Sequence, residues 1–521
     1  MLGTVYERLV NISFESDTNG LPNADARGTA GIFYTPRSEI DLMCRLALVD
    51  WLGNHVGRGR KDLLHAWVFA LSEEEKQSAD EEVGQAGLWE TLDALVRRVR
   101  ACDPACGSGS FLVGLLLILD DLQDRCNKQL GRDETPYERR KRIIQDQLYG
   151  LDVMEWAVRV AVLRLWLQLV VETELQSSQL TAQPLLPNLN LKLRPGDSLL
   201  QTIGDVDFSP FRRAELGIPS SLRQRLAKLQ EQKRKFFQGE ISSLKEDNLR
   251  KQEQRLFRDI LQHRLKKLKE QVKLKQDQLK AVPTPQVFRW SEETTSQAAT
   301  SPSPEQSRRA QLKREIEDLD AEIKCLEDAI DALREDQPIP FVWDLAFVEV
   351  FADKDPGFDI VIGNPPYVRQ EKIRDYLGRF DRGEYIHRLN EGLRAIYPEF
   401  MGTSRRISGR ADYYVYFYLH AMSLLADKGA FCFITSNSWL DVDFGKDLQE
   451  FFLRFGELKM VIDNRARRSF AQADVNTVIV LAGSPKRQRS LEAAEMNCRH
   501  VRFVAFHVPF EQALSPVVFS E

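Results

Sequence analysis

The stretch VRACDPACGSGSF, residues 99–111, decides the fold class, because it joins a short apolar strand to a glycine-rich turn and then to an apolar helix. Gly107 and Gly109 allow the backbone to pass close to a ligand, and the first turn of the helix presents backbone N–H groups to it. A strand, a glycine turn and a helix in this order are typical of an α/β sheet.

Three classes of ligand compete for this turn. A phosphate loop requires Gly-Lys-Ser/Thr, and the turn contains no lysine. A dinucleotide site requires a third glycine, where Leu112 stands. Asp103 at the end of the strand, with Pro104 and Ala105 in the turn, instead suits a cationic cofactor with an amino-acid tail. A plain tight turn without a ligand is the structural alternative.

Short apolar segments recur on both sides of a long charged stretch and predict one sheet built in two halves. The expected strands lie at 99–102, 148–151, 189–193, 358–362, 430–434, 459–462 and 477–481. Helical patterns at 156–170 and 413–425 fit between them. The predicted units are a helical N-terminal region at 1–95, the two halves of the sheet at 96–207 and 341–485, an insertion at 208–340, and a tail or the start of a truncated recognition region at 486–521.

The insertion carries heptad spacing, which predicts a coiled coil. The seam residues are Leu261, Leu265, Leu268, Val272 and Leu279, followed by Leu312, Ile316, Leu319, Ile323, Leu326, Ile330 and Leu333. A segment rich in Pro, Ser, Thr and Gln separates the two runs, so we expect an antiparallel helical hairpin. The first helix, at about 221–280, is basic. A solvated face, a DNA contact and a protein contact all remain open for it.

Two further carboxylates follow predicted strands. Asp152 ends the second strand, where an acidic residue can accept hydrogen bonds from both hydroxyls of a ribose; a helix cap is the alternative. Asp197 follows the third strand and can accept a hydrogen bond from an adenine amine; a turn aspartate is the alternative.

The most specific motif is DIVIGNPPY at 359–367, which places Asn-Pro-Pro-Tyr after an apolar strand. The lone pair of an exocyclic purine amine is delocalised into the ring, so the amine is a poor nucleophile. Two acceptors on its hydrogens, the Asn364 side-chain oxygen and the Pro365 carbonyl, would free that lone pair. Pro365 and Pro366 restrict the backbone that presents this carbonyl. Tyr367 offers a ring on which a flipped base can stack.

The composition of the chain excludes several classes of binding site. A net charge of −5 argues against a uniformly basic coat, so any DNA-binding surface must be local. The seven cysteines form no CxxC pair, which argues against a disulfide framework and a structural zinc, and we expect no metal site. We also expect no signal peptide, no membrane span and a cytoplasmic location.

With these motifs in order, the chain resembles the γ class of N6-adenine DNA methyltransferases. The closer resemblance is to the methylase portion of type IIG restriction–modification enzymes and to related phage-defence methylases. It implies a Rossmann-like fold that depends on S-adenosylmethionine, and a site-specific, adenine-specific DNA methyltransferase acting in restriction–modification or phage defence.

The resemblance also assigns residues. The segment GIFYTP at 31–36 matches an upstream cofactor motif, in which Thr35 and Pro36 would help hold the methionine end. Asp103, Pro104, Ala105, Gly107, Gly109, Asp152 and Asp197 match the cofactor positions. Asn364, Pro365, Pro366 and Tyr367 match the catalytic tetrapeptide. Phe470 matches the aromatic residue that packs on the opposite face of the extruded adenine from Tyr367, with a core phenylalanine as the alternative.

The chain departs from the type IIG pattern at both ends. We find no nuclease signature before the methylase and too few residues after it for a recognition domain. We therefore expect double-stranded DNA as substrate, with room for a separate target-recognition or nuclease subunit. Two rival functions remain: a methyltransferase of the same fold acting on protein glutamine or RNA, and a non-catalytic DNA-binding subunit.

Overall fold

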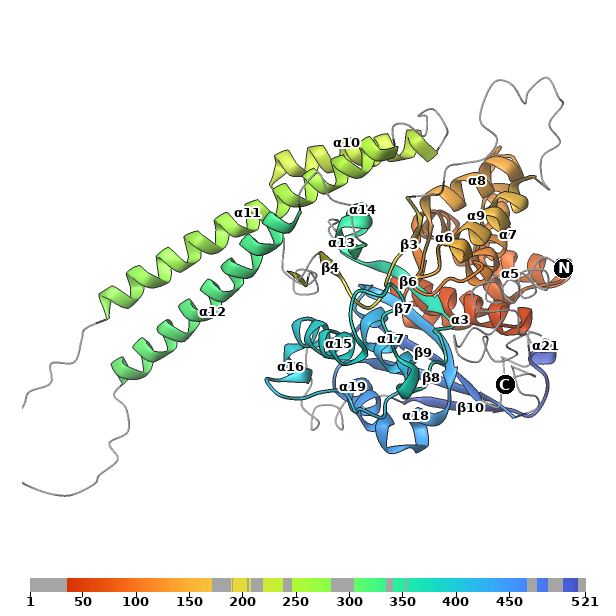
Figure 1. The fold of residues 1–521 in the computed structure, drawn as a ribbon. Coiled ribbons are helices and arrows are strands. Elements are labelled where there is room, and N and C mark those ends of the chain that lie inside the picture. The colour runs from red at the N-terminus through yellow and green to blue at the C-terminus, as the bar shows by residue number, and fades with distance from the viewer. Residues whose placement is uncertain are drawn as a thin grey trace, which may run out of the picture.

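A computed structural model of the chain describes residues 35–170, 189, 191–203, 206–207, 219–237, 246–282, 304–333, 341–351, 353, 355–465, 476–485 and 500–513. These residues form a central sheet with helices on both faces, and two long helices project from this body (Figure 1). The Rossmann-like α/β class expected from the sequence is confirmed.

The central sheet has the strand order β10-β8-β9-β7-β6-β1-β2-β3. Its strands are β1 (Ala101–Asp103), β2 (Leu148–Asp152), β3 (Leu193–Pro195), β6 (Phe358–Gly363), β7 (Leu425–Ser436), β8 (Glu457–Asn464), β9 (Thr477–Gly483) and β10 (Arg502–Phe506). Only β9 runs antiparallel to its neighbours. The chain moves outward from β1 to β3 and then resumes at β6 on the other side of β1. The carboxyl ends of β1 and β6 therefore form the switch point at which such sheets bind ligands.

Alternating side chains divide the interior into two cores. On β6, Ile360 and Ile362 enter one core and Val361 the other; on β7, Cys432 and Phe433 divide in the same way. Because both faces of these strands are covered, residues 360–362 of β6 and 430–434 of β7 are apolar on both faces rather than alternately polar.

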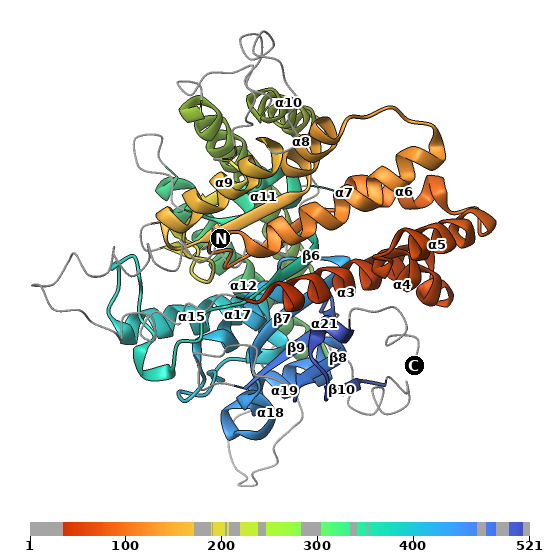
Figure 2. The same cartoon turned by 90° about the vertical axis from the view of Figure 1, so that its right-hand side faces the viewer.

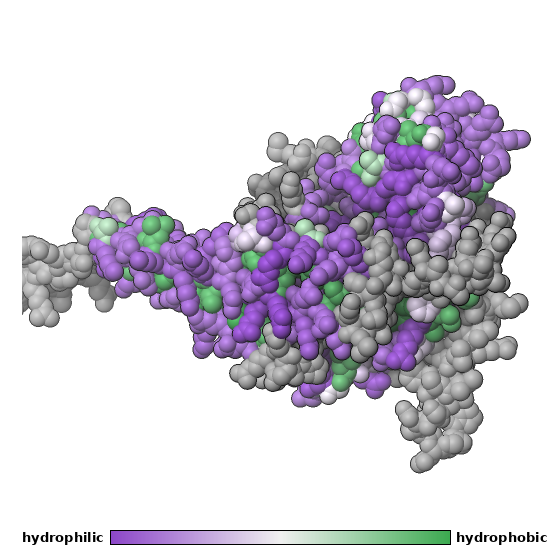
Figure 3. Space-filling view, turned by 90° about the horizontal axis from the view of Figure 1, so that it is seen from above, coloured by the Kyte–Doolittle hydropathy of each residue, from purple (hydrophilic) through white to green (hydrophobic). Residues whose placement is uncertain are grey.

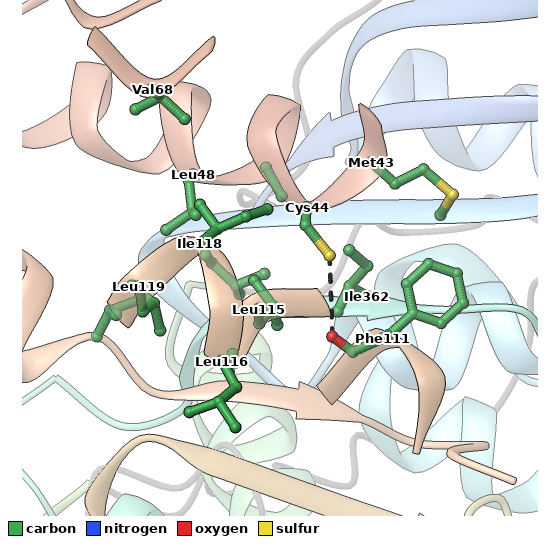
Figure 4. Close-up of a cluster of buried hydrophobic side chains, with 14 of the residues drawn as sticks. Met43, Cys44, Leu48, Val68, Phe111, Leu115, Leu116, Ile118, Leu119 and Ile362 are labelled. Carbon is green, nitrogen blue, oxygen red and sulfur yellow. Dashed lines mark hydrogen bonds between the residues drawn. The ribbon is translucent and has the colours of Figure 1, made fainter. Parts of the chain in front are cut away.

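Helices α3 (Arg37–Val56), α7 (Ser110–Leu130) and α9 (Glu155–Val170) cover the first face, where α3 and α7 lie side by side (Figure 2). In Figure 4, Leu48 of α3 lies next to Ile118 of α7, and Cys44 of α3 points toward Phe111 of α7 beside Ile362 of β6. Helices α15 (Arg382–Ile396), α17 (Tyr413–Met422) and α19 (Lys446–Arg454) belong to the second face.

Shorter elements complete the body. They are α4 (Lys61–Phe69), α5 (Glu73–Gln85), α6 (Trp89–Arg98), α8 (Pro136–Asp146), α13 (Trp343–Ala346), α14 (Val348–Phe351), α16 (Pro398–Met401), α18 (Ser438–Asp441), α21 (Phe510–Ala513) and the two-stranded sheet of β4 (Thr202–Ile203) and β5 (Val206–Asp207). Helix α8 begins with a capping box between Thr135 and Glu138, which satisfies backbone N–H groups of its first turn. No helix of the described residues is long and apolar enough to cross a membrane.

The insertion forms α10 (Ser220–Phe237), α11 (Glu246–Ala281) and α12 (Pro304–Ala332). Helices α11 and α12 run antiparallel as an arm that leaves the body (Figure 1). Leu261, Leu268, Leu326 and Ile330 of the predicted seam are buried between them. The rest of the arm's surface is mostly hydrophilic, with scattered apolar patches (Figure 3).

A buried ionic cluster anchors the arm to the edge of the sheet. Lys233 Nζ of α10 lies 2.6 Å from Glu253 Oε1 of α11 and 2.6 Å from Glu349 Oε2 of α14. Arg194 Nη2 of β3 donates to Glu253 at 2.9 and 3.1 Å. Burial alone would raise the pKa of Glu349, but Lys233 and Lys192 outweigh it and lower that pKa to about 2. Removing one partner from such a cluster leaves a buried charge uncompensated.

Several expectations about the elements are wrong in detail. The third strand is residues 193–195 rather than 189–193, and the long basic helix expected at 221–280 is two helices, α10 and α11. The helix expected at 413–425 ends at Met422, because Leu425 already pairs with Phe358 as part of β7. The first strand begins at Ala101 instead of Val99. Within the expected tail, β10 pairs with β8 and adds an edge strand to the sheet.

Candidate active site

The glycine turn after β1 is held by hydrogen bonds from neighbouring segments. Gly107 N donates to Asp152 Oδ2 at 2.9 Å, and the other oxygen of that carboxylate accepts from Met154 N at 2.8 Å. Ser198 Oγ donates to the Pro104 carbonyl. The three predicted cofactor segments, after β1, β2 and β3, are thus joined at one end of the sheet.

Gly109 is required by geometry. Its φ is +74°, and a Cβ there would lie 2.9 Å from Cβ of Ala161 on α9. Arg164, one turn further along α9, donates from Nη1 to Ser108 O at 3.0 Å, Ser108 Oγ at 2.9 Å and Ser110 Oγ at 2.8 Å. Sequence reasoning missed Ala161 and Arg164, because neither belongs to a local motif.

Asp103 is a buried carboxylate that few hydrogen-bond donors contact. Its Oδ1 accepts from Ala105 N at 3.0 Å, and within the described part of the chain it takes part in no ion pair. Burial raises its pKa to about 8, and the nearby charge of Asp152 adds to that shift. A buried carboxylate without a cation beside it suits a cationic ligand, because such a ligand would supply the missing charge.

Gly363 brings the two halves of the sheet together. A Cβ at this position would lie 2.6 Å from Asp103 Oδ1 and 3.3 Å from Asp103 Cγ. The residue before Asn364 must therefore lack a side chain for Asp103 to keep its place. The glycine stands inside the quoted motif, but only the structure gives this reason for it.

Asn364 follows β6 directly, and its Nδ2 donates to Thr35 Oγ1 at 3.0 Å. Thr35, expected at the methionine end of a cofactor, is thus also in contact with the tetrapeptide that the sequence predicts to be catalytic. Pro36 is the residue before α3. The Tyr367 hydroxyl donates to the Ile434 carbonyl of β7 at 3.2 Å, which holds the outer end of the ring beside that strand.

The segment after the tetrapeptide is tied back to the fold. Val368 O accepts from Tyr413 N at 3.0 Å, and Gln370 N donates to Asp412 Oδ1 at 3.2 Å. Pro366 O accepts from Val368 N at 3.0 Å. The start of α17 therefore holds the backbone on the carboxyl side of the tetrapeptide.

The Asp197 carboxylate accepts hydrogen bonds from four donors. Oδ1 accepts from Leu199 N at 2.9 Å and Leu200 N at 3.2 Å, while Oδ2 accepts from Arg379 Nη2 at 2.7 Å and the Tyr385 hydroxyl at 3.1 Å. Two donors per oxygen use the usual capacity of a carboxylate. An adenine amine can bind there only if one of these donors leaves.

The predicted residues are therefore brought together, with one exception. Asp103, the glycine turn, Asp152, Asp197, Thr35 and Asn364 are linked directly or through shared partners at the switch point. Phe470 lies outside the described residues.

Comparison with known proteins places this site in a family. A family model described as Eco57I restriction-modification methylase matches residues 146–470, well over half of the chain. A second model, described as MmeI, DNA-methyltransferase domain, matches residues 74–195.

Two named relatives agree with these matches. The putative type II restriction enzyme and methyltransferase RM.MjaORFECS2P of Methanocaldococcus jannaschii is 30% identical over 215 residues, which are 39% of this chain and 17% of that protein. The type II methyltransferase M.BstVI of Geobacillus stearothermophilus is 33% identical over 106 residues, which are 20% of this chain and 16% of that protein. The matched regions thus span less than a fifth of either relative.

Among solved structures, the ATP-dependent Type ISP restriction-modification enzyme LlaBIII bound to DNA is 12% identical, with a TM-score of 0.42, over 99% of this chain and 22% of that one. The Type IIL restriction-modification enzyme MmeI in complex with DNA is 12% identical, with a TM-score of 0.39, over 89% and 38%. These scores are too low to bear on function, and the assignment rests on the sequence match across 146–470. On that match, the chain belongs to the Eco57I restriction-modification methylase family.

Proposed function

We propose that this chain transfers a methyl group from S-adenosylmethionine to the exocyclic N6 of adenine in double-stranded DNA, as the modification activity of a restriction–modification or phage-defence system. One observation carries the proposal: Asn364 follows β6 at the switch point, and the glycine before it lies against the Asp103 carboxylate at the end of β1. The acceptor and cofactor motifs therefore meet at one place.

The residues fit the cofactor by chemistry. The Asp103 carboxylate provides a negative charge for a cation, and Gly107 and Gly109, both at positive φ, let the backbone turn sharply around a ligand. Asp152 would serve the ribose hydroxyls, and the backbone of Thr35 together with Pro36 would lie near the methionine end, while the Thr35 hydroxyl is bonded to Asn364. When bound, S-adenosylmethionine supplies an electrophilic methyl group on a cationic sulfur.

Asp197 would receive the adenine of the cofactor only by exchanging a donor. Leu199 N and Leu200 N are held by the backbone, and the Tyr385 side chain is buried. Arg379, with 28% of its side chain exposed, is the donor that water can solvate most easily. We therefore assign Arg379 as the group that gives way.

On the acceptor side, Asn364 Oδ1 and the Pro365 carbonyl would each accept a hydrogen of the target amine. That draws the amine toward tetrahedral geometry and exposes its lone pair. Tyr367 would stack on the flipped base, and Phe470 is assigned to the opposite face. Extruding the base costs a few kcal/mol, which stacking and the two hydrogen bonds offset.

The test is transfer of labelled methyl from S-adenosylmethionine to mixed-sequence duplex DNA, followed by nucleoside analysis, with Asn364→Ala as the matched variant. We expect N6-methyladenine from the parent chain and none from the variant, with unchanged cofactor affinity. Equal activity in the two proteins would exclude the role of Asn364.

The rival functions give other outcomes. Label in RNA or in a protein glutamine would show that this methyltransferase fold acts on an acceptor other than DNA. Cofactor and DNA binding without transfer, restored by a copurifying polypeptide, would identify a missing recognition subunit. Binding without transfer under every condition would indicate a non-catalytic DNA-binding subunit.

A further inference from the structure

Helix α3 is fixed to β6 at both ends of that strand. Near the amino end, Trp51 Nε1 donates to Asp359 Oδ1 at 3.1 Å, and Arg100 N holds the other oxygen of that carboxylate at 2.8 Å. At the carboxyl end, Asn364 Nδ2 donates to Thr35 Oγ1, one residue before Pro36 and α3. The helix therefore lies along the strand as a brace.

The middle of this brace is packed closely. Cys44 Sγ lies 3.8 Å from the Phe111 carbonyl of α7, and Ile362 belongs to the same apolar cluster (Figure 4). At Gly114 of α7 a Cβ would lie 2.7 Å from Ile40 Cγ2. Because α3 cannot shift without disturbing α7, the position of Thr35 relative to β6 is set by the core.

Thr35 is itself buried, with 4% of its surface exposed. Its Oγ1 therefore faces the Asn364 amide rather than bulk water. An asparagine amide can adopt two orientations that exchange its oxygen and nitrogen, and the hydrogen-bond partners decide between them.

We propose that Thr35 is a positioning residue that orients the Asn364 amide, so that Oδ1 is presented to the target amine. With Nδ2 donating to Thr35, the planar amide directs Oδ1 away from Thr35. A hydroxyl can also donate, but a threonine that donated to Oδ1 would occupy the acceptor that the amine requires. The productive arrangement is thus the one in which Thr35 accepts. This inference rests on the proposed function.

Two substitutions separate this role from cofactor binding. Thr35→Val keeps the shape of the side chain and removes the hydroxyl, whereas Thr35→Ser keeps the hydroxyl. We expect Thr35→Val to lower kcat by about tenfold, because an Asn364 amide that is no longer oriented loses its hydrogen bond to the target amine in the transition state. The KM and Kd for S-adenosylmethionine should stay within about twofold of the parent values. Thr35→Ser should keep most of the parent kcat.

A second readout needs no turnover. In protein labelled with 15N-asparagine, the Asn364 side-chain signal is identified as the one absent from Asn364→Asp. Its Nδ2 protons should exchange with water more slowly in the parent and in Thr35→Ser than in Thr35→Val. Thermal unfolding of the three proteins checks that the fold is kept.

Each outcome bears on the inference. Equal exchange in the parent and in Thr35→Val would overturn it, as would an equal kcat. A raised cofactor Kd with an unchanged kcat would assign Thr35 to the cofactor instead. If the parent makes no N6-methyladenine, the proposed function fails, while the exchange measurement still decides whether Thr35 orients the amide.

Discussion

Replacing Gly363 by alanine tests the contact between the acceptor and cofactor segments. The added Cβ would lie 2.6 Å from Asp103 Oδ1, whereas Phe433 Cε1 is an ordinary 3.5 Å away. The carboxylate is therefore the group that must move. It is buried and accepts a hydrogen bond from Ala105 N at 3.0 Å, so it cannot rotate without breaking that bond.

Two costs follow from this movement. Overpacking a well-filled interior costs about 1–3 kcal/mol, which should appear as lower stability of the protein without ligand. Losing a hydrogen bond to a charged group costs about 1.5–3 kcal/mol. The displaced carboxylate also moves away from the expected position of the cofactor's cation. Since about 1.4 kcal/mol is tenfold in affinity, we expect cofactor affinity to fall by about tenfold to a hundredfold.

Isothermal calorimetry with S-adenosylmethionine measures the affinity, and chemical unfolding measures the stability. Gly59→Ala is the control, because nothing lies within 4 Å of a Cβ at that position. If Gly363→Ala bound the cofactor as tightly as the parent and methylated DNA at the same rate, the contact between residue 363 and Asp103 would matter neither for cofactor binding nor for methylation.

Two more predictions concern charge. Burial, and to a smaller extent the charge of Asp152, raises the pKa of Asp103 to about 8. Between about pH 4 and pH 8 the folded protein therefore keeps a proton on Asp103 that the unfolded chain has lost. The contribution of Asp103 to the stability of the ligand-free protein consequently falls as pH rises through this range. A bound sulfonium favours the ionised carboxylate, so affinity for S-adenosylmethionine should rise by up to about tenfold per pH unit below about pH 8 and then level off. S-adenosylhomocysteine lacks that charge, so its affinity should change less with pH when both ligands are measured by calorimetry at several pH values. Equal slopes for the two ligands would contradict a cation at Asp103. Glu253→Gln should destabilise the protein by about 3–5 kcal/mol in denaturant unfolding, because Lys233 and Arg194 lose a buried partner. Glu315→Gln, whose pair with Lys275 is about one-third exposed, should cost much less, and a similar loss in both variants would argue against the anchoring role of the cluster.

Local patterns predicted which segments meet at one edge of the sheet. The glycine turn after β1, the carboxylate after β2 and the tetrapeptide after β6 each combine a strand end with residues close in sequence. Parallel strands bring their carboxyl ends to one edge, so these motifs had to converge. The heptad seam predicted the pairing of α11 with α12 for the same reason, because its spacing is a local property.

Contacts between distant segments could not be predicted in this way. Arg379 binds Asp197 across 182 positions of sequence, and Arg164 holds Ser108 from a helix whose pattern shows only an apolar face. The break between α10 and α11 was missed, although Gly239 and the pair Ser242 and Ser243 stand between the two helices in the sequence. Strand β10 was missed because its exposed residues, Phe503 among them, lack the alternation of a half-buried strand.

The two halves of the candidate active site share two carboxylates, Asp103 and Asp197. Asp103 belongs to the cofactor side by sequence, yet its position limits the residue before Asn364 on the acceptor side. Asp197 also follows a cofactor strand, yet Arg379 and Tyr385 of the acceptor half supply two of its four donors. A charged insertion separates these halves along the chain, so their alignment depends on such contacts and on α3. Changes at either carboxylate should therefore alter cofactor affinity and acceptor geometry together, whereas loss of the Thr35 hydroxyl should alter only the geometry.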